Sequence, residues 1–399
     1  MLSIPAVNIT TSEFKADPFP FYARLRAEAP VYQTHLPDGR TAWLITRYAD
    51  VLAVLKDDRF GKNKINARKP PWLPGIFRPL MRNMLDQDPP DHTRLRGLVQ
   101  KVFTTRLVED LRERIQRLAD ELLQRAQAEG RMDVIADYAV PIPVTIIARM
   151  LGVPAKDQHR FHSWSKAAIA STSSRWGIIV ALPQAHAFLR YVQKLVKAKR
   201  AVPGDDLAAA LVRAEEAGDR LSEDELVAMI FLLLVAGHET TVNLIGNGVL
   251  TLLENPDQMH RLMDNAALIK PAVEELLRYN GPLETATERY TRTEVTVANV
   301  TIPRGELVFA VLASANRDEQ QFERADMLDL GREPNAHVAF GFGIHYCLGA
   351  PLARLEGQIA IATLLRGFQN LKLAVPIKLL RWRRGLVLRG LEHLPIVCS

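Results

Sequence analysis

The amino-acid sequence predicts a mainly α-helical fold with small β-sheets. Between Asp50 and Asn280 nearly every stretch has the apolar spacing of a helix, and prolines interrupt it at intervals. The β-type runs are short and lie outside this range. The 399-residue chain has no Gly/Ser-rich linker, repeat or low-complexity tract, so we expect one domain over residues 1–399.

The N-terminal part should combine one helix with a hairpin. A short helix is expected near Pro18–Glu28, and the β-type runs Val31–His35 and Thr41–Ile45 follow it. Pro37-Asp38-Gly39 lies between these runs and is typical of a tight turn. The breaks in the helical part fall at Pro70-Pro71, Pro89-Pro90, Pro154, Pro203-Gly204 and Pro256.

The longest predicted helix extends from Ser222 to Leu253. Ser222 and Glu225 form a capping box at its start, and Asn255-Pro256 follows its end. Such a helix would be on the order of 48 Å long at about 1.5 Å per residue. Its middle is apolar on nearly every side, which indicates a core helix. The polar run 238–241 inside it therefore needs a functional reason, because burying polar groups is costly.

The C-terminal part should contain short strands and one long helix. β-type runs return at Glu294–Val297, at Leu307–Val311 and within Leu386–Val397. Leu352–Arg366 has helical spacing, with a proline just before it, where the first helical turn tolerates one. Cys347 thus precedes a helix N-terminus, where unpaired N–H groups favour an anion and lower a thiol pKa.

Composition excludes several classes of partner. The net charge is +6, but Lys and Arg are scattered among Asp and Glu, which argues against nucleic acid. The two cysteines, Cys347 and Cys398, cannot build a disulfide framework, so a reducing, cytoplasmic compartment is expected. Met1–Pro30 lacks the pattern of a signal peptide. The longest apolar run, Leu226–Gly237, is shorter than the ~20 residues of a membrane span, so no membrane partner is expected.

Cys347 lies in the run Phe340-Gly341-Phe342-Gly343-Ile344-His345-Tyr346-Cys347-Leu348-Gly349. A thiolate pushes electron density onto a haem iron and favours O–O cleavage, and glycines let the backbone approach a flat cofactor closely. The alternative is an inert buried cysteine, the commoner fate of a lone cysteine. The spacing F-x-x-G-x-x-x-C-x-G resembles the signature of the haem-thiolate monooxygenases, the cytochrome P-450 family.

This resemblance covers the chain from about Asp17 to its end and implies a fold and an activity. The fold would be a large helical domain with small sheets and a long central helix over the haem. The cofactor would be haem b (iron protoporphyrin IX) with the Cys347 thiolate as axial ligand. The enzyme would insert one atom of O2 into a small apolar organic substrate, by hydroxylation or epoxidation. Its electrons would come from a separate ferredoxin and ferredoxin reductase, and a monomer is expected.

The run Ala236-Gly237-His238-Glu239-Thr240 resembles the oxygen-activation motif of that family. By this resemblance the Thr240 hydroxyl lies beside bound dioxygen, and Glu239 controls the supply of the protons that O–O cleavage requires. The alternative is a helical threonine that bonds back to a backbone carbonyl, next to an exposed glutamate.

Basic residues should converge on the haem propionates. His92 and Arg96 share a helix face at i,i+4 spacing, and Arg289 and His345 match further propionate ligands of the family. Each of the four taken singly would more often be a solvated surface charge.

An E-x-x-R pair, Glu275 and Arg278, has the i,i+3 spacing that places both side chains on one helix face. In the resembled family this pair joins a third arginine in a structural role, and Arg332 occupies the matching position.

Substrate contacts are expected, again by resemblance, from five segments. These are Phe60–Met84, Phe161–Ile179, Leu232–Ala236, Leu283–Thr287 and Leu386-Val387. The first carries many apolar side chains, among them Trp72 and Leu73, and suggests a fairly large apolar ligand.

Two other functions remain open from the sequence. A peroxide-driven haem-thiolate enzyme would generally lack the acid–alcohol pair that Glu239 and Thr240 form. A non-catalytic haem-binding sensor would be expected to carry a signalling or DNA-binding segment, and none is recognisable.

Overall fold

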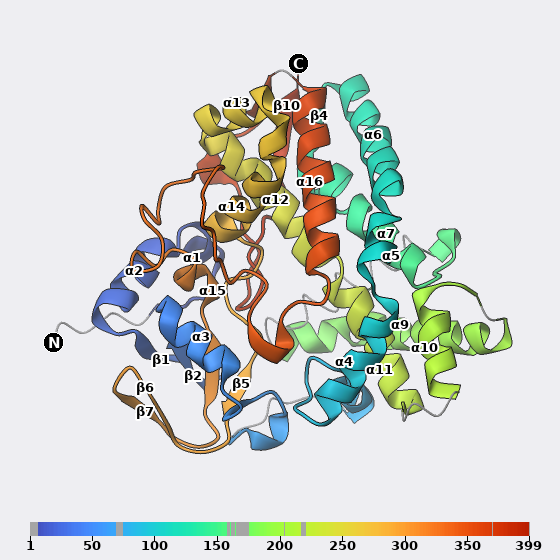
Figure 1. The fold of residues 1–399 in the computed structure, drawn as a ribbon, viewed down its shortest axis with the longest axis vertical. Helices are drawn as coiled ribbons and strands as arrows, with labels where there is room; N and C mark the ends of the chain where they lie inside the picture. The colour runs from blue at the N-terminus through green and yellow to red at the C-terminus, as the bar shows by residue number, and fades with distance from the viewer. Residues whose placement is uncertain are drawn as a thin grey trace.

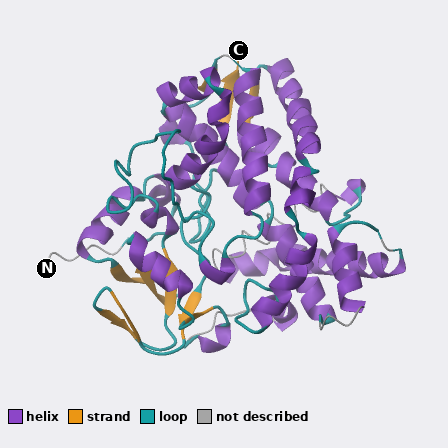
Figure 2. Ribbon diagram, in the orientation of Figure 1, coloured by secondary structure: helices purple, strands orange, loops and turns teal. Residues whose placement is uncertain are grey.

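The computed structural model describes residues 7–68, 75–157, 160, 164, 175–202, 204–216, 221–368 and 370–398. Helices form most of the described chain, with strands at the lower left of Figures 1 and 2 and a second group at the top, beside the C-terminus. The mainly α-helical fold predicted from the sequence is confirmed.

The helices follow one another along most of the chain. Those before residue 202 are α1 (Ser12–Ala16), α2 (Phe19–Glu28), α3 (Tyr48–Lys56), α4 (Asp91–Val102), α5 (Thr105–Glu109), α6 (Arg112–Glu129), α7 (Pro141–Met150) and α9 (Arg175–Ala201). The later ones are α10 (Leu207–Glu216), α11 (Glu223–Ala236), α12 (Glu239–Glu254), α13 (Pro256–Asp264), α14 (Ile269–Asn280), α15 (Leu312–Ala315) and α16 (Ala350–Gly367).

The strands form three small sheets. They are β1 (Val31–His35), β2 (Thr41–Ile45), β3 (Phe60–Gly61), β4 (Arg131–Asp133), β5 (Arg289–Thr291), β6 (Val295–Val297), β7 (Val300–Ile302), β8 (Leu307–Ala310), β9 (Leu371–Leu373) and β10 (Pro395–Cys398). The largest sheet has the order β1-β2-β8-β5-β3, the second β4-β10-β9, and β6 pairs with β7. In Figure 1 the labelled strands of the largest sheet lie near α1, α2 and α3.

The predicted hairpin is confirmed, because β1 and β2 pair antiparallel with Val31 opposite Ile45. Gly39 in its turn has φ +82°, a conformation that glycine adopts without strain. The strands β3 and β4 lie in the region that the sequence predicts as helical. Of the predicted C-terminal β-type run, only β10 forms a regular strand.

The long central helix is divided in two, which corrects the prediction of one continuous helix. The predicted capping box of Ser222 and Glu225 does open α11. That helix ends at Ala236, and α12 begins at Glu239 after His238, whose φ of −126° and ψ of −48° are not helical. The break therefore falls within the predicted oxygen-activation run.

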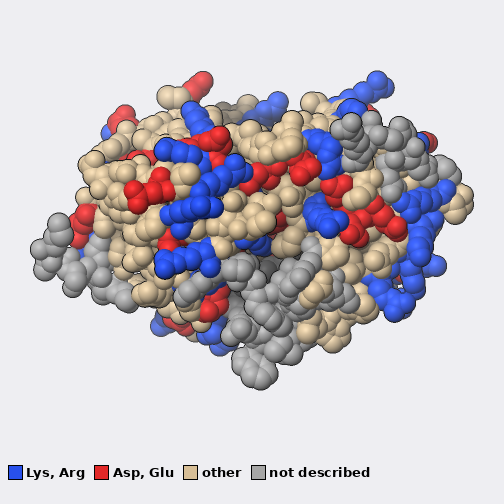
Figure 3. All heavy atoms as spheres, turned by 90° about the horizontal axis from the view of Figure 1, so that it is seen from below, with Lys and Arg blue, Asp and Glu red and all other residues tan. Residues whose placement is uncertain are grey.

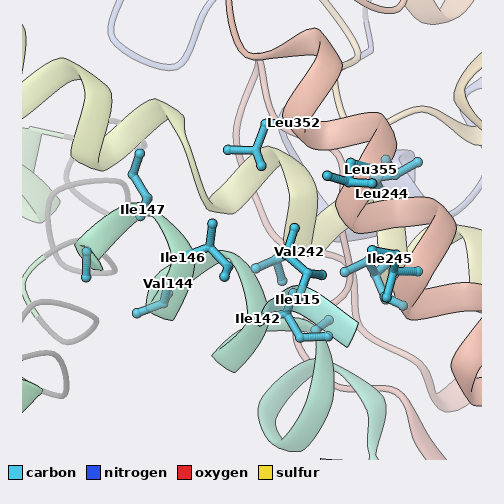
Figure 4. Close-up of a cluster of buried hydrophobic side chains, with 14 of the residues drawn as sticks. Ile115, Ile142, Val144, Ile146, Ile147, Val242, Leu244, Ile245, Leu352 and Leu355 are labelled. Carbon is cyan, nitrogen blue, oxygen red and sulfur yellow. The ribbon is translucent and has the colours of Figure 1, made fainter. Parts of the chain in front are cut away.

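The main hydrophobic core lies between α12, α16, α6 and α7. Figure 4 shows Leu355 of α16 beside Leu244 of α12, with isoleucines of α6 and α7 lower in the view. By length and hydropathy alone, the described stretch 223–254 could cross a membrane. However, 61% of its most apolar window is buried in the protein, as in a core helix.

The two signs of charge are interspersed on the face of the molecule shown in Figure 3. In Figure 3, which shows the molecule from below, Lys and Arg side chains alternate with Asp and Glu. This distribution agrees with the scattered charges of the sequence.

Candidate active site

Cys347 lies in a tight loop that ends at the N-terminus of α16. The Cys347 amide donates to the Phe340 carbonyl at 3.0 Å, and the Tyr346 amide donates to the Gly343 carbonyl at 3.0 Å. Gly341 and Gly343 have φ values of +71° and +74°, which disfavour any other residue. A Cβ on Gly343 would also come within 2.7 Å of the Leu55 carbonyl oxygen. The loop's shape thus depends on its glycines.

The thiol of Cys347 lies beside a hollow of about 460 Å³, between this loop and helices α4 and α5. Cys347 is exposed toward the hollow, yet protein atoms surround the thiol on most sides, and this burial raises its pKa. The amides of Gly349 and Ala350 and the Arg96 guanidinium act in the opposite direction. The helix N-terminus therefore acts to lower the pKa of Cys347, as predicted, but the opposite effect of burial is larger.

The four predicted propionate ligands lie close together. The rings of His92 and His345 have their centroids 4.2 Å apart. Arg96 donates through Nη2 to the Tyr346 carbonyl at 2.7 Å, which ties α4 to the cysteine loop. Arg289, at the start of β5, donates to the Phe60 carbonyl at 3.0 Å. The sequence-based grouping of these residues is supported by their geometry.

Lys62 is a fifth basic residue of this cluster, and the sequence analysis missed it. Its side chain is buried, with Nζ bonded to the Thr287 hydroxyl and to the Glu288 carbonyl at 2.8 Å. Its sequence position after Phe60-Gly61 gave no signal, because a lysine in a short loop is usually solvated. We refer to His92, Arg96, Arg289, His345 and Lys62 as the basic cluster.

The basic groups of the cluster lower one another's pKa. Burial and the neighbouring Arg289 lower the pKa of Lys62 to about 7. Burial, Lys62 and His92 together lower the pKa of His345 to about 2. The nearby carboxylate of Asp88 is engaged elsewhere, because it accepts from the amides of Lys62 and Asn63 and pairs with a further arginine.

Several donor atoms of the basic cluster also have no partner among the described residues. They are both ring nitrogens of His92, Nε of Arg289 and Nε2 of His345. Unpaired buried polar atoms cost about 1–3 kcal/mol each, so such a group needs an anionic ligand to be stable. The donor set suits the two carboxylates on one edge of a haem.

The expected acid–alcohol pair lies in the first turn of α12. The Thr240 hydroxyl donates to the Ala236 carbonyl at 3.2 Å. Glu239 is buried, and Arg383 donates to its Oε2 at 2.6 Å. Nε2 of the buried His238 lies 3.9 Å from Glu239 Oε1. Nothing in the sequence pointed to Arg383, which is 144 positions from Glu239.

The Thr240 hydroxyl therefore bonds back to a backbone carbonyl, as expected for a helical threonine without a catalytic role. That alternative also expected an exposed Glu239, and Glu239 is buried. Within the described part of the chain, no hydrogen bond or ion pair joins either residue to Cys347 or to the basic cluster.

The E-x-x-R pair forms a buried network that supports the cysteine loop from α14. Arg278 binds Glu275 with two hydrogen bonds of 2.7 and 2.8 Å. Arg332 donates to the same carboxylate at 3.1 Å, as the resemblance implied. Asn335 and the amide of Asp329 add two more donors. The Glu275 carboxylate is thus fully bonded despite its burial.

A second ion-pair network, which the sequence analysis did not predict, connects α14 with α16. Arg354 binds the Glu274 carboxylate with two hydrogen bonds of 2.8 Å, and His337 approaches the same group at 3.0 Å. Partial burial of Glu274 opposes ionisation, but the hydrogen bonds from His337 and Arg354 outweigh it and lower its pKa to about 2. Arg354 also lies over the Phe340 ring, 4.4 Å from its centroid. The network thereby fixes the segment that carries Cys347.

Part of the expected substrate site lies outside the described residues. This applies to Trp72 and Leu73, with the rest of 69–74, and to residues 161–174 apart from Trp164. Of the other expected segments, Leu283 pairs with Leu388 in an isolated bridge, so 283–287 and 386–387 lie side by side.

The family model described as cytochrome P-450 matches residues 181–389. A relative from Saccharopolyspora erythraea named "Cytochrome P-450 107B1" is 46% identical over 98% of each chain. "Vitamin D(3) 25-hydroxylase" of Pseudonocardia autotrophica is 44% identical over 98% of this chain and 96% of its own. The solved structure of the Bacillus subtilis cytochrome P-450 PksS, from a bacillaene polyketide synthase, has a TM-score of 0.92 and 41% identity. That match covers 98% of this chain and 100% of the other.

Proposed function

Since the chain belongs to the cytochrome P-450 family and is a monooxygenase, we propose that Cys347 is the axial ligand of its haem iron. The haem, when bound, supplies an iron that binds and activates O2, and a thiolate ligand favours O–O cleavage. The amides at the start of α16 and Arg96 already favour the thiolate form of Cys347. The coordinate bond would remove the effect of burial, because it takes up the charge that burial disfavours.

The observation that carries this proposal is the basic cluster. We propose that Arg96, Arg289, His92 and His345 bind the two propionates, with Lys62 as an additional donor. His92, Arg289 and His345 would each gain a charge-assisted hydrogen bond in place of an unpaired buried atom. The cluster lies next to the cysteine loop, since Arg96 bonds to Tyr346 directly. One haem could therefore bind to Cys347 and to the basic cluster at the same time.

Thr240 and Glu239 would direct protons to the reaction. The hydrogen of the Thr240 hydroxyl points to the Ala236 carbonyl, so its oxygen is free to accept a hydrogen bond. Glu239 is held by Arg383, and its carboxylate can turn toward the reaction only when that ion pair opens. Arg383 is 22% exposed, so the pair has access to solvent.

The substrate is proposed to be a small apolar organic molecule, such as the sterol-like or polyketide compounds that the names of the relatives indicate. The reaction would be hydroxylation or epoxidation. The whole chain, residues 1–399, would form one domain. We further propose a cytoplasmic monomer that receives its electrons from a ferredoxin and its reductase.

The axial ligand is tested by the absorption spectrum of the reduced carbon-monoxide complex. Wild-type protein should absorb at the position of a thiolate-ligated haem. Cys347→His should lose this band, whereas Cys398→Ser should retain it. Loss of the band in Cys398→Ser would overturn the assignment.

The activity is tested by NAD(P)H consumption with a surrogate ferredoxin and a panel of terpenoid, steroid, fatty-acid and macrolide ligands. A monooxygenase should consume NAD(P)H in a substrate-dependent way. A peroxide-driven enzyme would form product with peroxide alone, and a sensor would form none.

A further inference from the structure

Lys15 of α1 is a buried lysine that the function proposed above does not use. Its side chain and that of Glu284 are both completely buried, and Lys15 Nζ lies 2.5 Å from Glu284 Oε2. The hydroxyl of the buried Tyr22, in α2, donates to the other carboxylate oxygen, Oε1. Both oxygens of Glu284 are therefore engaged by the two N-terminal helices, although Glu284 is 269 positions from Lys15 in the sequence.

Arg389 connects the same helix to the C-terminal part of the chain. It is buried, donates through Nη1 to the Lys15 carbonyl, and donates through Nε to Asn280 Oδ1 at 3.1 Å. Its guanidinium lies over the Trp382 ring, 3.9 Å from the centroid. We refer to four residues together as the Lys15 network: Lys15, Tyr22, Glu284 and Arg389.

The Lys15 network bonds to two of the segments that are expected to contact the substrate, 283–287 and 386–387. Glu284 belongs to the first segment, and Lys15 Nζ also donates to the Leu386 carbonyl of the second at 3.4 Å. The segments pair with each other through the Glu284 amide, which donates to the Val387 carbonyl at 2.8 Å. Successive side chains of extended backbone point to opposite faces, so Glu284 can bind α1 without occupying the face that carries Thr285.

The segment 283–287 is held at its other end by the basic cluster. Lys62 donates to the Thr287 hydroxyl and to the Glu288 carbonyl. Two buried lysines therefore bind the segment, Lys62 from the side of the proposed haem site and Lys15 from the N-terminal helix. The position of the segment relative to the haem depends on both contacts, and haem binding explains only the one with Lys62.

Folding alone gives little reason for an ion pair at this place, because apolar side chains of similar volume often stabilise a buried position equally well. A charge-assisted hydrogen bond differs from apolar packing in that it fixes the distance and direction between its partners. We propose that Lys15 and Glu284 are positioning residues that set the size and shape of the apolar substrate site. They hold 283–287 and 386–387 in place without touching the substrate. This proposal deepens the proposed function and rests on it, because it concerns the same haem site.

The test uses the haem-loaded enzyme and ligands of increasing size: imidazole, 4-phenylimidazole and clotrimazole. In each ligand an imidazole nitrogen coordinates the haem iron, and the shift of the Soret band gives the Kd. Imidazole measures access to the iron, and the ratio of the clotrimazole and imidazole Kd values measures how well the surrounding site fits a bulky apolar body. A general loss of haem or of stability changes both Kd values alike and leaves the ratio unchanged.

The variants are Lys15→Met and the double variant Lys15→Met/Glu284→Gln. The double variant removes both charges of the pair, and its glutamine can still accept a hydrogen bond from Tyr22. In both, the Kd ratio should change by roughly 10- to 100-fold, since one methylene gained or lost in an apolar pocket changes discrimination by about 10- to 200-fold. Arg26→Met is the matched control, because Arg26 is a buried cation of α2 that bonds to Glu319 and Ser314 instead. It should lower the Tm and leave the Kd ratio unchanged.

The outcomes separate a positioning role from a merely stabilising one. If both Lys15 variants lower the Tm but keep the wild-type Kd ratio, the proposal is wrong. It is also wrong if Arg26→Met shifts the ratio as much as they do. If Lys15→Met does not fold, the double variant decides the question, because it buries no unpaired carboxylate. A wild-type protein without the thiolate-type carbon-monoxide spectrum would instead refute the proposed function, and the variants themselves should keep that spectrum.

Discussion

Replacing Lys62 by methionine should stabilise the haem-free protein and weaken haem binding at the same time. Lys62 is buried beside Arg289, and its pKa in the polypeptide alone is lowered to about 7. Methionine has a similar length and no charge, so the substitution removes the buried ammonium with little change in volume. The hydrogen bonds to Thr287 and Glu288 are lost with it.

The size of the effect follows from the difference between the folded and unfolded pKa values of Lys62. The ordinary pKa of a lysine is 10.5 and the folded value is about 7, a difference of about 3.5. At ~1.36 kcal/mol per unit this corresponds to roughly 5 kcal/mol, as an upper bound. The unfolded chain binds more protons between pH 7 and 10.5, so the free energy of unfolding of the haem-free protein rises with pH over this window.

Urea unfolding of the haem-free protein at pH 7 and pH 9 measures this slope. Wild type should be more stable at pH 9, and Lys62→Met should show a much smaller rise. With haem bound, the variant should lose a charge-assisted contact of about 1.5–3 kcal/mol and release haem roughly 10- to 150-fold faster. Lys64→Met is the control, because Lys64 is partly exposed and 3.7 Å from Asp86. An unchanged pH slope together with an unchanged haem-release rate in Lys62→Met would refute the reasoning.

Three further predictions concern the rest of the site. Thr240→Ala should bind haem and substrate and consume NAD(P)H but release hydrogen peroxide in place of product, and fully coupled turnover would contradict the proposed role of its hydroxyl. Arg278→Leu should lower the free energy of unfolding by about 3–5 kcal/mol, measured with urea, because it leaves the buried Glu275 without its bidentate partner. Turnover with a limiting electron donor should fall as ionic strength rises, since the net charge of +6 favours an acidic donor; turnover independent of salt would remove this argument.

Local patterns in the sequence predicted the parts of the site that depend on local geometry. Phe340, Gly343 and Cys347 belong to one short loop, which the hydrogen bond from the Cys347 amide to the Phe340 carbonyl closes. The positive φ of Gly341 and Gly343 shows why glycines are needed there. His92 and Arg96 share a helix face, so their common direction followed from their spacing. The structure then placed His345 against His92, which the resemblance implied but the residues alone could not show.

The features that the sequence could not provide depend on contacts between distant segments. Arg383 reaches Glu239 from the C-terminal part of the chain, and Lys62 reaches Glu288 across 226 positions. The break between α11 and α12 was also missed. Gly237 and His238 interrupt a run whose apolar pattern continues on both sides, and an isolated glycine in such a pattern is often tolerated.

The two kinds of buried charge in this protein indicate which residues stabilise the fold and which serve the reaction. Glu275 is completely buried, but every donor it needs comes from the chain itself, so it can hold α14 and the cysteine loop together without a ligand. Arg289 is also buried and His345 is half-buried, yet each keeps a polar atom that the described chain does not satisfy. Such atoms reduce stability by about 1–3 kcal/mol each, and folding alone gives no reason for them. An anionic ligand accounts for both.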